Sequence, residues 1–133
     1  MRRIFEYAGA VLGLLSAALL LRVTRYEIVE ESMIPALAPG DWTLGIKRPR
    51  AVSTGQIVVF EHPRRPGFEL VKRVAAAPGG RIHGRTMKPG EMWVEGDAPG
   101  SGSVDSRTLG AIPLTSLQAR LALRYKPLPF RLI

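Results

Sequence analysis

The stretch QIVVFEHPRRPGFELVKRVAA, residues 56–76, predicts two β-strands joined by a turn. Residues 56–61 and 69–76 are short apolar runs, which are typical of strands. Between them, Pro66 presets one turn dihedral and Gly67 permits a positive one, so the chain reverses its direction there. We therefore expect residues 56–76 to form a pair of antiparallel strands.

The same pattern recurs along most of the 133 residues. Further apolar runs and Pro-Gly pairs alternate, the runs at residues 26–29, 42–46, 91–95 and 119–125 and the pairs at residues 39–40, 78–79, 89–90 and 99–100. Short strands with frequent turns argue for an antiparallel barrel or sandwich, and this length suits one domain. Residues 101–106 are small and polar and are expected to be a loop. We predict a mostly β fold, an antiparallel β-barrel-like domain over residues 25–133.

The first 24 residues form a separate apolar segment. Residues 4–21 make an apolar stretch of eighteen residues with Glu6 as the one charge, about 27 Å long as a helix and close to the hydrocarbon thickness of a bilayer. The residues after Leu21 make a poor cleavage site, and a buried soluble helix would need a polar face. We predict an uncleaved transmembrane anchor over residues 1–24. Flanking arginines at both ends leave its orientation nearly undetermined.

The composition excludes several kinds of site. The chain has no cysteine and only two histidines, His62 and His83, so a disulfide scaffold, a cysteine nucleophile and a metal centre are not expected. Both histidines stand beside arginines and are expected at the surface, without a carboxylate partner. The net charge of +8 is spread over the chain instead of clustering with aromatic residues. This argues against nucleic acid and fits either anionic lipid headgroups or a solvated surface without a partner.

Serine and lysine remain as candidates for chemistry. A lysine that acts as a base must be neutral, so it should lie on an apolar face that lowers its pKa by burial. Of the four lysines, Lys72 fits best, because strand alternation places it on the face of Leu70 and Val74. The alternative is a lysine that extends its amine to solvent at the rim of the sheet. Ser32 lies where a strand meets a turn, and spacing alone cannot pair it with Lys72.

Four segments of the chain add a further signal: SMIPALAPGD at residues 32–41, GQIVVF at 55–60, LVKRVAAAPG at 70–79 and GDAPGSGSVDSRTLG at 96–110. In this order they resemble the sequence boxes of type I signal peptidases. The compact layout is similar to mitochondrial inner-membrane peptidases and to small bacterial relatives that mature nickel superoxide dismutases.

The resemblance implies a membrane-anchored serine endopeptidase that removes signal or leader peptides from exported proteins without a cofactor. Ser32 would attack the scissile carbonyl and form an acyl-enzyme, and Lys72 would take the hydroxyl proton and later activate water. The supporting residues it implies are Ser103, which orients the lysine amine, the pair of Asp105 and Arg107 beneath the site, and Met33. The family's topology implies a single-pass protein of the cell membrane, with the amino terminus in the cytoplasm and the catalytic domain outside.

Glu30 departs from the family pattern, in which Ser or Gly usually stands two residues before the nucleophile and often contributes to the oxyanion hole. A carboxylate that faces a developing oxyanion would raise the barrier. We therefore expect Glu30 to point away from the site or to be protonated. It also leaves open a second hypothesis, a catalytically inactive, membrane-anchored β-module that binds exported proteins.

Overall fold

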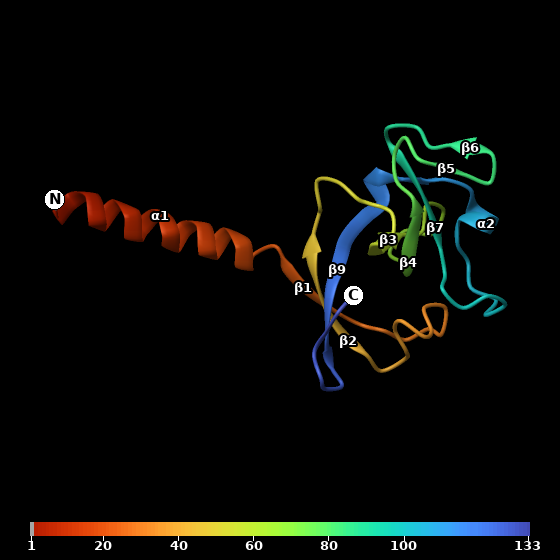
Figure 1. The fold of residues 1–133 in the computed structure, drawn as a ribbon, viewed down its shortest axis with the longest axis horizontal. Helices are drawn as coiled ribbons and strands as arrows, with labels where there is room; N and C mark the ends of the chain where they lie inside the picture. Colours follow the sequence, from red (N-terminus) through yellow and green to blue (C-terminus); the bar gives the residue numbers. More distant parts are fainter. Residues whose placement is uncertain (1) are drawn as a thin grey trace.

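A long N-terminal helix precedes a β-rich domain in the computed structural model, which describes the backbone of residues 2–133 and the side chains from residue 9 onward (Figure 1). Helix α1 covers Arg2–Leu20 and projects away from the strands (Figure 1). Strand β1 begins at Val23, directly after the helix and a short turn.

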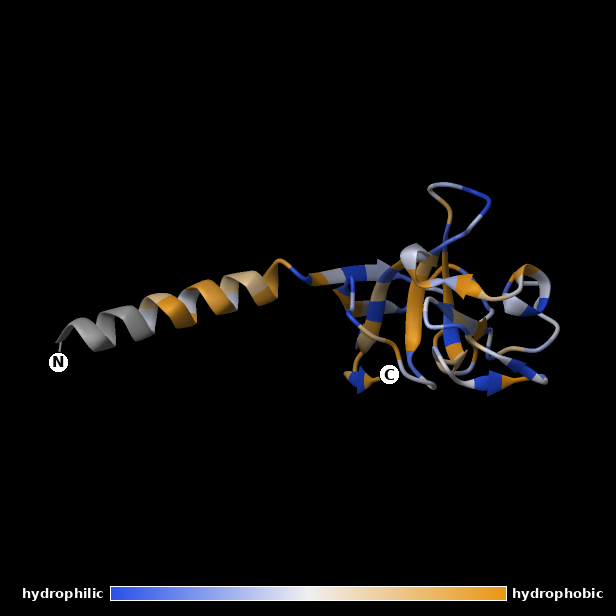
Figure 2. Cartoon of the chain, turned by 90° about the horizontal axis from the view of Figure 1, so that it is seen from above, coloured by the Kyte–Doolittle hydropathy of each residue, from blue (hydrophilic) through white to orange (hydrophobic). Residues whose placement is uncertain are grey.

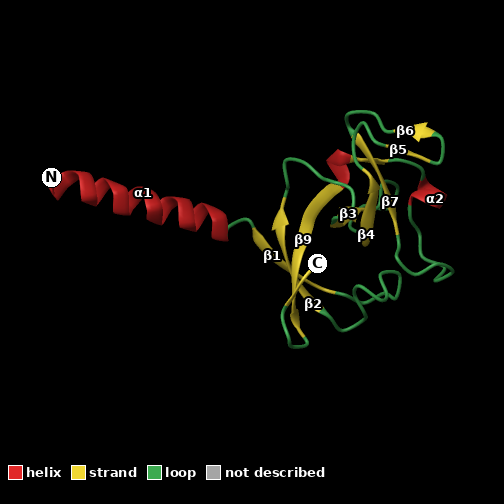
Figure 3. Ribbon diagram, viewed as in Figure 1, coloured by secondary structure: helices red, strands yellow, loops and turns green. Residues whose placement is uncertain are grey.

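The domain consists mainly of antiparallel strands, drawn as arrows in Figure 3. Its larger elements are β1 (Val23–Glu27), β2 (Trp42–Lys47), β3 (Ile57–Glu61), β4 (Glu69–Ala76), β7 (Glu91–Glu95) and β9 (Leu117–Lys126). The short ones are β5 (Arg81–Ile82), β6 (Arg85–Thr86), α2 (Ser106–Leu109), β8 (Ile112–Pro113), a 3-10 turn (Leu114–Ser116) and β10 (Arg131–Leu132). The spatial order is β1-β2-β9-β3-β4-β7-β8, with β10 beside β9 and β5 paired with β6. This confirms the prediction of a mostly β fold.

The expected pairing of residues 56–76 is confirmed. Strands β3 and β4 are antiparallel neighbours, with Val59 opposite Val71. Gly67 adopts a φ of 80° in the connection between them, a conformation that glycine reaches without strain.

The strand order corrects the prediction of a barrel-like architecture. A barrel closes when its two edge strands pair, but in the described part of the chain β1 and β8 end the path without pairing with each other. Strand β8 is only two residues long, so it offers too few backbone groups to close the sheet. The domain is therefore built on an open sheet.

Helix α1 coincides with the apolar segment for which a transmembrane anchor was predicted. Figure 2 shows apolar residues along its described part, and large side chains such as Leu14 and Leu20 are exposed there. Among the described residues, no helix combines the length and the apolar character needed to cross a membrane. The helix ends at Leu20, and its first turns include Arg2, Arg3 and Glu6. The prediction that residues 1–24 span a membrane is not supported by the structure.

Strand β3 is buried on both faces because it lies between two apolar cores. The first core contains Val52, Val58, Phe60, Leu70, Val74, Met92, Val94 and Ile112. The second core contains Ile28, Met33, Leu37, Ile57, Val59, Ala119 and Leu121. Alternate residues of β3 enter one core or the other, which explains why residues 57–60 are continuously apolar.

We predict that Gly45→Ala lowers the free energy of unfolding by about 1–3 kcal/mol. A Cβ at Gly45 in β2 would lie 2.7 Å from the backbone oxygen of Arg120 in β9, so the two strands would have to separate. Urea unfolding followed by circular dichroism measures the loss. Gly90→Ala is the matched control, because a Cβ there meets nothing within 4 Å. Equal losses in the two variants would contradict the prediction.

Candidate active site

Ser32 and Lys72 lie in direct contact although forty residues separate them. The Lys72 Nζ donates a hydrogen bond to the Ser32 Oγ at 2.8 Å and another to the Val71 carbonyl oxygen at 3.1 Å. Lys72 is 0% exposed and Ser32 is 2% exposed. Lys72 shares the buried face of β4 with Leu70 and Val74, as strand alternation predicted.

The pKa of the Lys72 amine is lowered from its ordinary value. Burial is the largest cause, because the charged form loses its hydration. Glu30 and Asp105 oppose this shift as nearby negative charges, and the positive charge of Arg107 adds to it. The outcome is an amine that gives up its proton more readily than a solvated lysine and so suits a general base. The other three lysines, all within the described residues, are exposed: Lys47, Lys88 and Lys126.

The backbone of Ser32 is held from two sides. Met33, its neighbour in the chain, is 1% exposed and packs in the second core, where Leu37 follows one turn later. The Leu37 N–H donates to the Met33 carbonyl oxygen at 2.9 Å. On the opposite side, the Ala98 N–H donates to the Ser32 carbonyl oxygen at 2.9 Å. The Ser32 hydroxyl is therefore presented to Lys72 from a fixed turn.

Gly96 allows the segment of residues 96–98 to pass close to this turn. A Cβ at Gly96 would lie 2.8 Å from the Ser32 carbonyl oxygen and 3.5 Å from the Ser103 Oγ. Ser103 thus lies beside the site. Within the described residues, however, the hydrogen bonds of Lys72 Nζ go to Ser32 and Val71, and Ser103 is not a partner. The orienting role expected for Ser103 stays a prediction.

Asp105 and Arg107 form the expected pair, and they reach the site through Gly96. Asp105 is 1% exposed and accepts a hydrogen bond from the Gly96 N–H at 3.0 Å. The Arg107 guanidinium contacts the same carboxylate at 2.5 Å, and the Arg107 N–H donates to it at the start of α2. Burial alone would raise the pKa of Asp105, but the hydrogen bonds from Arg107 and Gly96 lower it overall. The ionised carboxylate therefore braces the segment that holds Ser32.

Two supporting contacts were not predicted from the sequence. Arg73 donates two hydrogen bonds to Asp97, at 2.8 and 2.6 Å, and a third to the Gly55 carbonyl oxygen at 2.7 Å. The buried Ser106 Oγ accepts a hydrogen bond from the Val94 N–H at 2.9 Å. The signal for the first was present, because Arg73 alternates with Lys72 along β4 and Asp97 follows Gly96.

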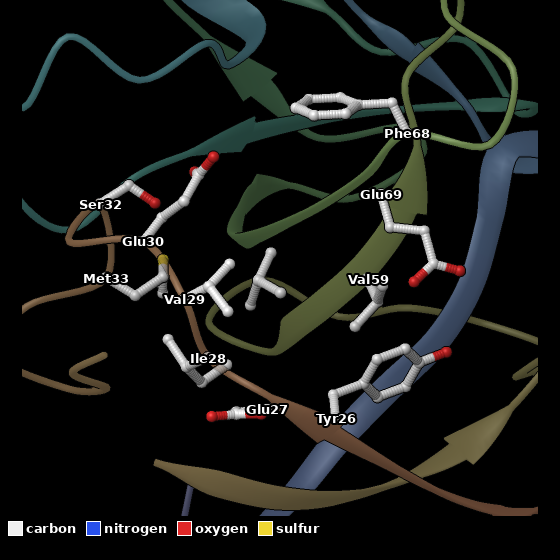
Figure 4. Close-up of a pocket in the computed structure, with 11 residues that line it drawn as sticks. Tyr26, Glu27, Ile28, Val29, Glu30, Ser32, Met33, Val59, Phe68 and Glu69 are labelled. Atoms are coloured by element: carbon white, nitrogen blue, oxygen red, sulfur yellow. The ribbon is translucent and has the colours of Figure 1, made fainter. Parts of the chain in front are cut away.

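Two hollows meet at Ser32. The first, of about 220 Å³, lies between the residues that follow β1 and the start of β4, and Figure 4 shows its lining. Its walls are mostly apolar, with Glu27, Glu30 and Glu69 as the charged members. The second hollow, of about 440 Å³, adjoins residues 101–103. Both hollows are lined by Val29, Glu30 and Ser32. An extended chain placed across the two hollows would therefore pass over the Ser32 hydroxyl.

Glu30 does not point away from the site. Its Oε2 lies 3.9 Å from the Lys72 Nζ, and the Glu30 side chain is 49% exposed. The carboxylate thus faces the amine of the candidate base. This contact depends on the conformation of the segment between β1 and Ser32, which a sequence pattern does not specify.

The histidines differ in part from their prediction. His62 is buried, at 8% exposure, and its Nδ1 accepts a hydrogen bond from the Arg64 N–H at 3.0 Å. His83 is exposed as expected, but its Nε2 lies 2.9 Å from the Glu95 carboxylate, a partner that was not predicted. Neither histidine lines either hollow at Ser32 in the described part of the chain. Lysine is therefore the candidate base beside Ser32.

Residues 1–88 match the family described as signal peptidase, peptidase S26. The chain belongs to this family of signal peptidases. The resemblance of the chain to signal peptidases is thereby confirmed, and the match includes three of the four segments, at residues 32–41, 55–60 and 70–79. The matched residues include Ser32 and Lys72 and end before Ser103.

Three curated relatives support the assignment of the chain to the signal peptidases. Signal peptidase I of Buchnera aphidicola subsp. Baizongia pistaciae is 37% identical over 73 residues, covering 44% of this chain and 24% of the relative. Mitochondrial inner membrane protease subunit 1 of Xenopus tropicalis is 31% identical over 88 residues, covering 59% and 52%. Subunit 2 of Saccharomyces cerevisiae is 34% identical over 79 residues, covering 53% and 44%. The match thus spans between about a quarter and about half of each relative's length.

We predict that Lys72→Met raises the free energy of unfolding of the protein at pH 7 by about 1 kcal/mol or more. The pKa of Lys72 is lower in the folded chain than in the unfolded one, so the unfolded chain binds more protons between the two values. Wild-type stability therefore rises with pH over this range. The advantage of the variant should shrink as the pH approaches about 10.4.

Urea unfolding of both proteins at pH 7 and near pH 10 measures this difference. Lys47→Met changes an exposed lysine and should show no such pH dependence. A gain for Lys72→Met of the same size at both pH values would contradict the explanation by charge burial.

Proposed function

We propose that this chain is a serine endopeptidase that removes signal or leader peptides from exported proteins, with Ser32 as nucleophile and Lys72 as general base. The observation that carries the proposal is the 2.8 Å contact between the Lys72 Nζ and the Ser32 Oγ, with the lysine fully buried. A neutral amine at this distance is placed to take the hydroxyl proton as the oxygen attacks. Membership of the signal peptidase family supports the choice of reaction.

The proposed reaction has two halves. Ser32 Oγ attacks the scissile carbonyl carbon while its proton passes to Lys72, and the ammonium then protonates the leaving amine as the peptide bond breaks. This yields an acyl-enzyme and returns Lys72 to its neutral form. Lys72 next takes a proton from water, whose hydroxide attacks the ester. The ammonium then returns this proton to the Ser32 Oγ as the second product is released. The Ser32 N–H contributes to stabilising the oxyanion in both halves.

The remaining predicted residues act by position in this proposal. Met33 fixes the turn of Ser32 through the second core, and Asp105 with Arg107 holds Gly96 against that turn. Ser103 orients the lysine amine once a peptide is bound. The preprotein lies in the first hollow as an extended strand, where backbone hydrogen bonds contribute affinity and side-chain pockets contribute specificity.

We expect the detergent-solubilised protein to cleave a preprotein that carries an Ala-X-Ala site. Ser32→Ala and Lys72→Ala should each lower the rate by at least about 1,000-fold, because each removes one member of the reacting pair. Gel analysis and mass spectrometry of the cut site provide the measurement. Ser53→Ala, at an exposed serine, is the control and should cleave normally.

Labelling of Ser32 by an acylating serine-protease probe separates the enzyme from the inactive β-module. Lack of both labelling and cleavage by the parent protein would favour the module. Cleavage that persists in Ser32→Ala would contradict the proposed nucleophile.

We further propose that α1 associates with the lipid bilayer and brings the site close to membrane-bound substrates. Support comes from its large exposed side chains, among them Leu12 at 64%, Leu15 at 63% and Leu19 at 61%. Apolar area of this kind is stabilised in the acyl region of a membrane, and the positive net charge of the chain adds attraction to anionic headgroups.

Flotation with vesicles of phosphatidylcholine and phosphatidylglycerol tests this association. The triple variant Leu12→Glu, Leu15→Glu and Leu19→Glu should lose most of the vesicle-bound fraction, because it places three charges on one side of α1. Leu128→Glu is the control, since Leu128 is even more exposed, at 72%, but lies near the other end of the chain. Equal flotation of the triple variant and the parent would contradict the role of α1.

A further inference from the structure

Glu30 and Lys72 form an ion pair that separates easily. The Glu30 Oε2 lies 3.9 Å from the Lys72 Nζ, whereas the hydrogen bonds of the amine go to Ser32 and Val71. One partner is fully buried and the other is 49% exposed. Glu30 can therefore swing into solvent without breaking a hydrogen bond to the lysine, and the cost of separating the pair is small.

The other charges that act on Lys72 are fixed in place. Asp105 and Arg107 at the start of α2 have opposite effects on the amine, and they are bound to each other at 2.5 Å. The Asp105 carboxylate also accepts the Gly96 N–H, so it cannot move without disturbing the segment beside Ser32. The Glu30 carboxylate, by contrast, has one polar side-chain interaction among the described residues, and this is its ion pair with Lys72. Of the charged groups that act on the Lys72 amine, Glu30 is thus the one that can move.

Glu30 also lies where a substrate must pass. It lines both hollows that meet at Ser32, so a peptide placed for attack by Ser32 contacts the Glu30 side chain. In addition, the attack creates negative charge on the carbonyl oxygen close to Ser32, which repels a carboxylate that remains nearby. Steric contact displaces Glu30 from Lys72 when the substrate binds, and charge repulsion keeps it away during the attack.

We propose that Glu30 is a displaceable counter-ion of the catalytic base, which holds Lys72 in its charged form in the free enzyme and is pushed aside by the bound peptide. The inference rests on the proposed Ser32 and Lys72 reaction and adds a positioning residue to it. In the free enzyme the ammonium of Lys72 is stabilised by the carboxylate. Once Glu30 moves away, the ammonium releases its proton to water and the neutral amine accepts the proton of Ser32. The base is thus activated by substrate.

The pH dependence of cleavage tests whether Glu30 controls the protonation of Lys72. As the pH falls, protonation of the base lowers both kcat/KM and kcat. The pH at which each falls to half its maximum, here called its acidic limb, reports the free enzyme for kcat/KM and the complex with peptide for kcat. In the wild type, the limb of kcat/KM should lie about one pH unit above that of kcat, the size expected for two charges about 4 Å apart that are screened by water. In Glu30→Gln the limb of kcat/KM should move down until the two limbs coincide. Glu31→Gln, which removes the neighbouring carboxylate, should leave both limbs in place.

A second measurement follows the lysine itself. In the Ser32→Ala variant, which binds peptide without cleaving it, the 13Cε resonance of Lys72 should titrate at lower pH with the peptide than without it. Introducing Glu30→Gln into this variant should abolish the difference.

Coincident limbs in the wild type, or a lysine titration that peptide leaves unchanged or raises, would overturn the inference. Failure of the proposed function is recognised separately, as cleavage that is absent from the parent or that survives Ser32→Ala.

Discussion

The buried amine of Lys72 is the feature on which the architecture of the site depends. The apolar neighbours of Lys72 on β4 deprive a charged amine of its hydration, which is costly, and the oxygen acceptors of Ser32 and Val71 offset part of this cost. The same burial lowers the pKa of the amine and makes it a better base. Stability and reactivity are therefore in conflict at this residue, and the surrounding strands compensate for the loss of stability.

Consecutive residues of β4 organise opposite sides of the sheet. Lys72 faces Ser32, whereas Arg73 points to the other side and binds Asp97 with two hydrogen bonds. Asp97 lies next to Ala98, whose N–H holds the Ser32 carbonyl oxygen. The strand thus positions the base directly and the nucleophile indirectly, through a path that runs from Arg73 to the turn of Ser32. Asp105 reinforces this path by binding the Gly96 N–H.

Local patterns in the sequence predicted the parts of this arrangement that arise from local geometry. Apolar runs between turns identified β2, β3, β4, β7 and β9, whereas the run at residues 26–29 shares only two residues with β1. Strand alternation identified Lys72 as the buried lysine. Two-residue strands such as β8 are too short to show a periodicity, and the open edge of the sheet depends on long-range pairing.

Long-range features of the site were beyond these patterns. No spacing rule connects Ser32 with Lys72, and it was the resemblance to a family that suggested the pair. The contact of Glu30 with the amine and the burial of His62 depend on loop conformations, which apolar periodicity does not encode.

The position of β3 between two cores has a consequence for inactivation by heat. Lys72 lies on the face of the first core, beside Leu70 and Val74, and Ser32 is held by Met33, which belongs to the second core. Because β3 contributes side chains to both cores, loosening of either one disturbs the other. The 2.8 Å contact therefore joins residues that are held by different cores, and we expect heat to break it in the same step in which the packing of these cores is lost.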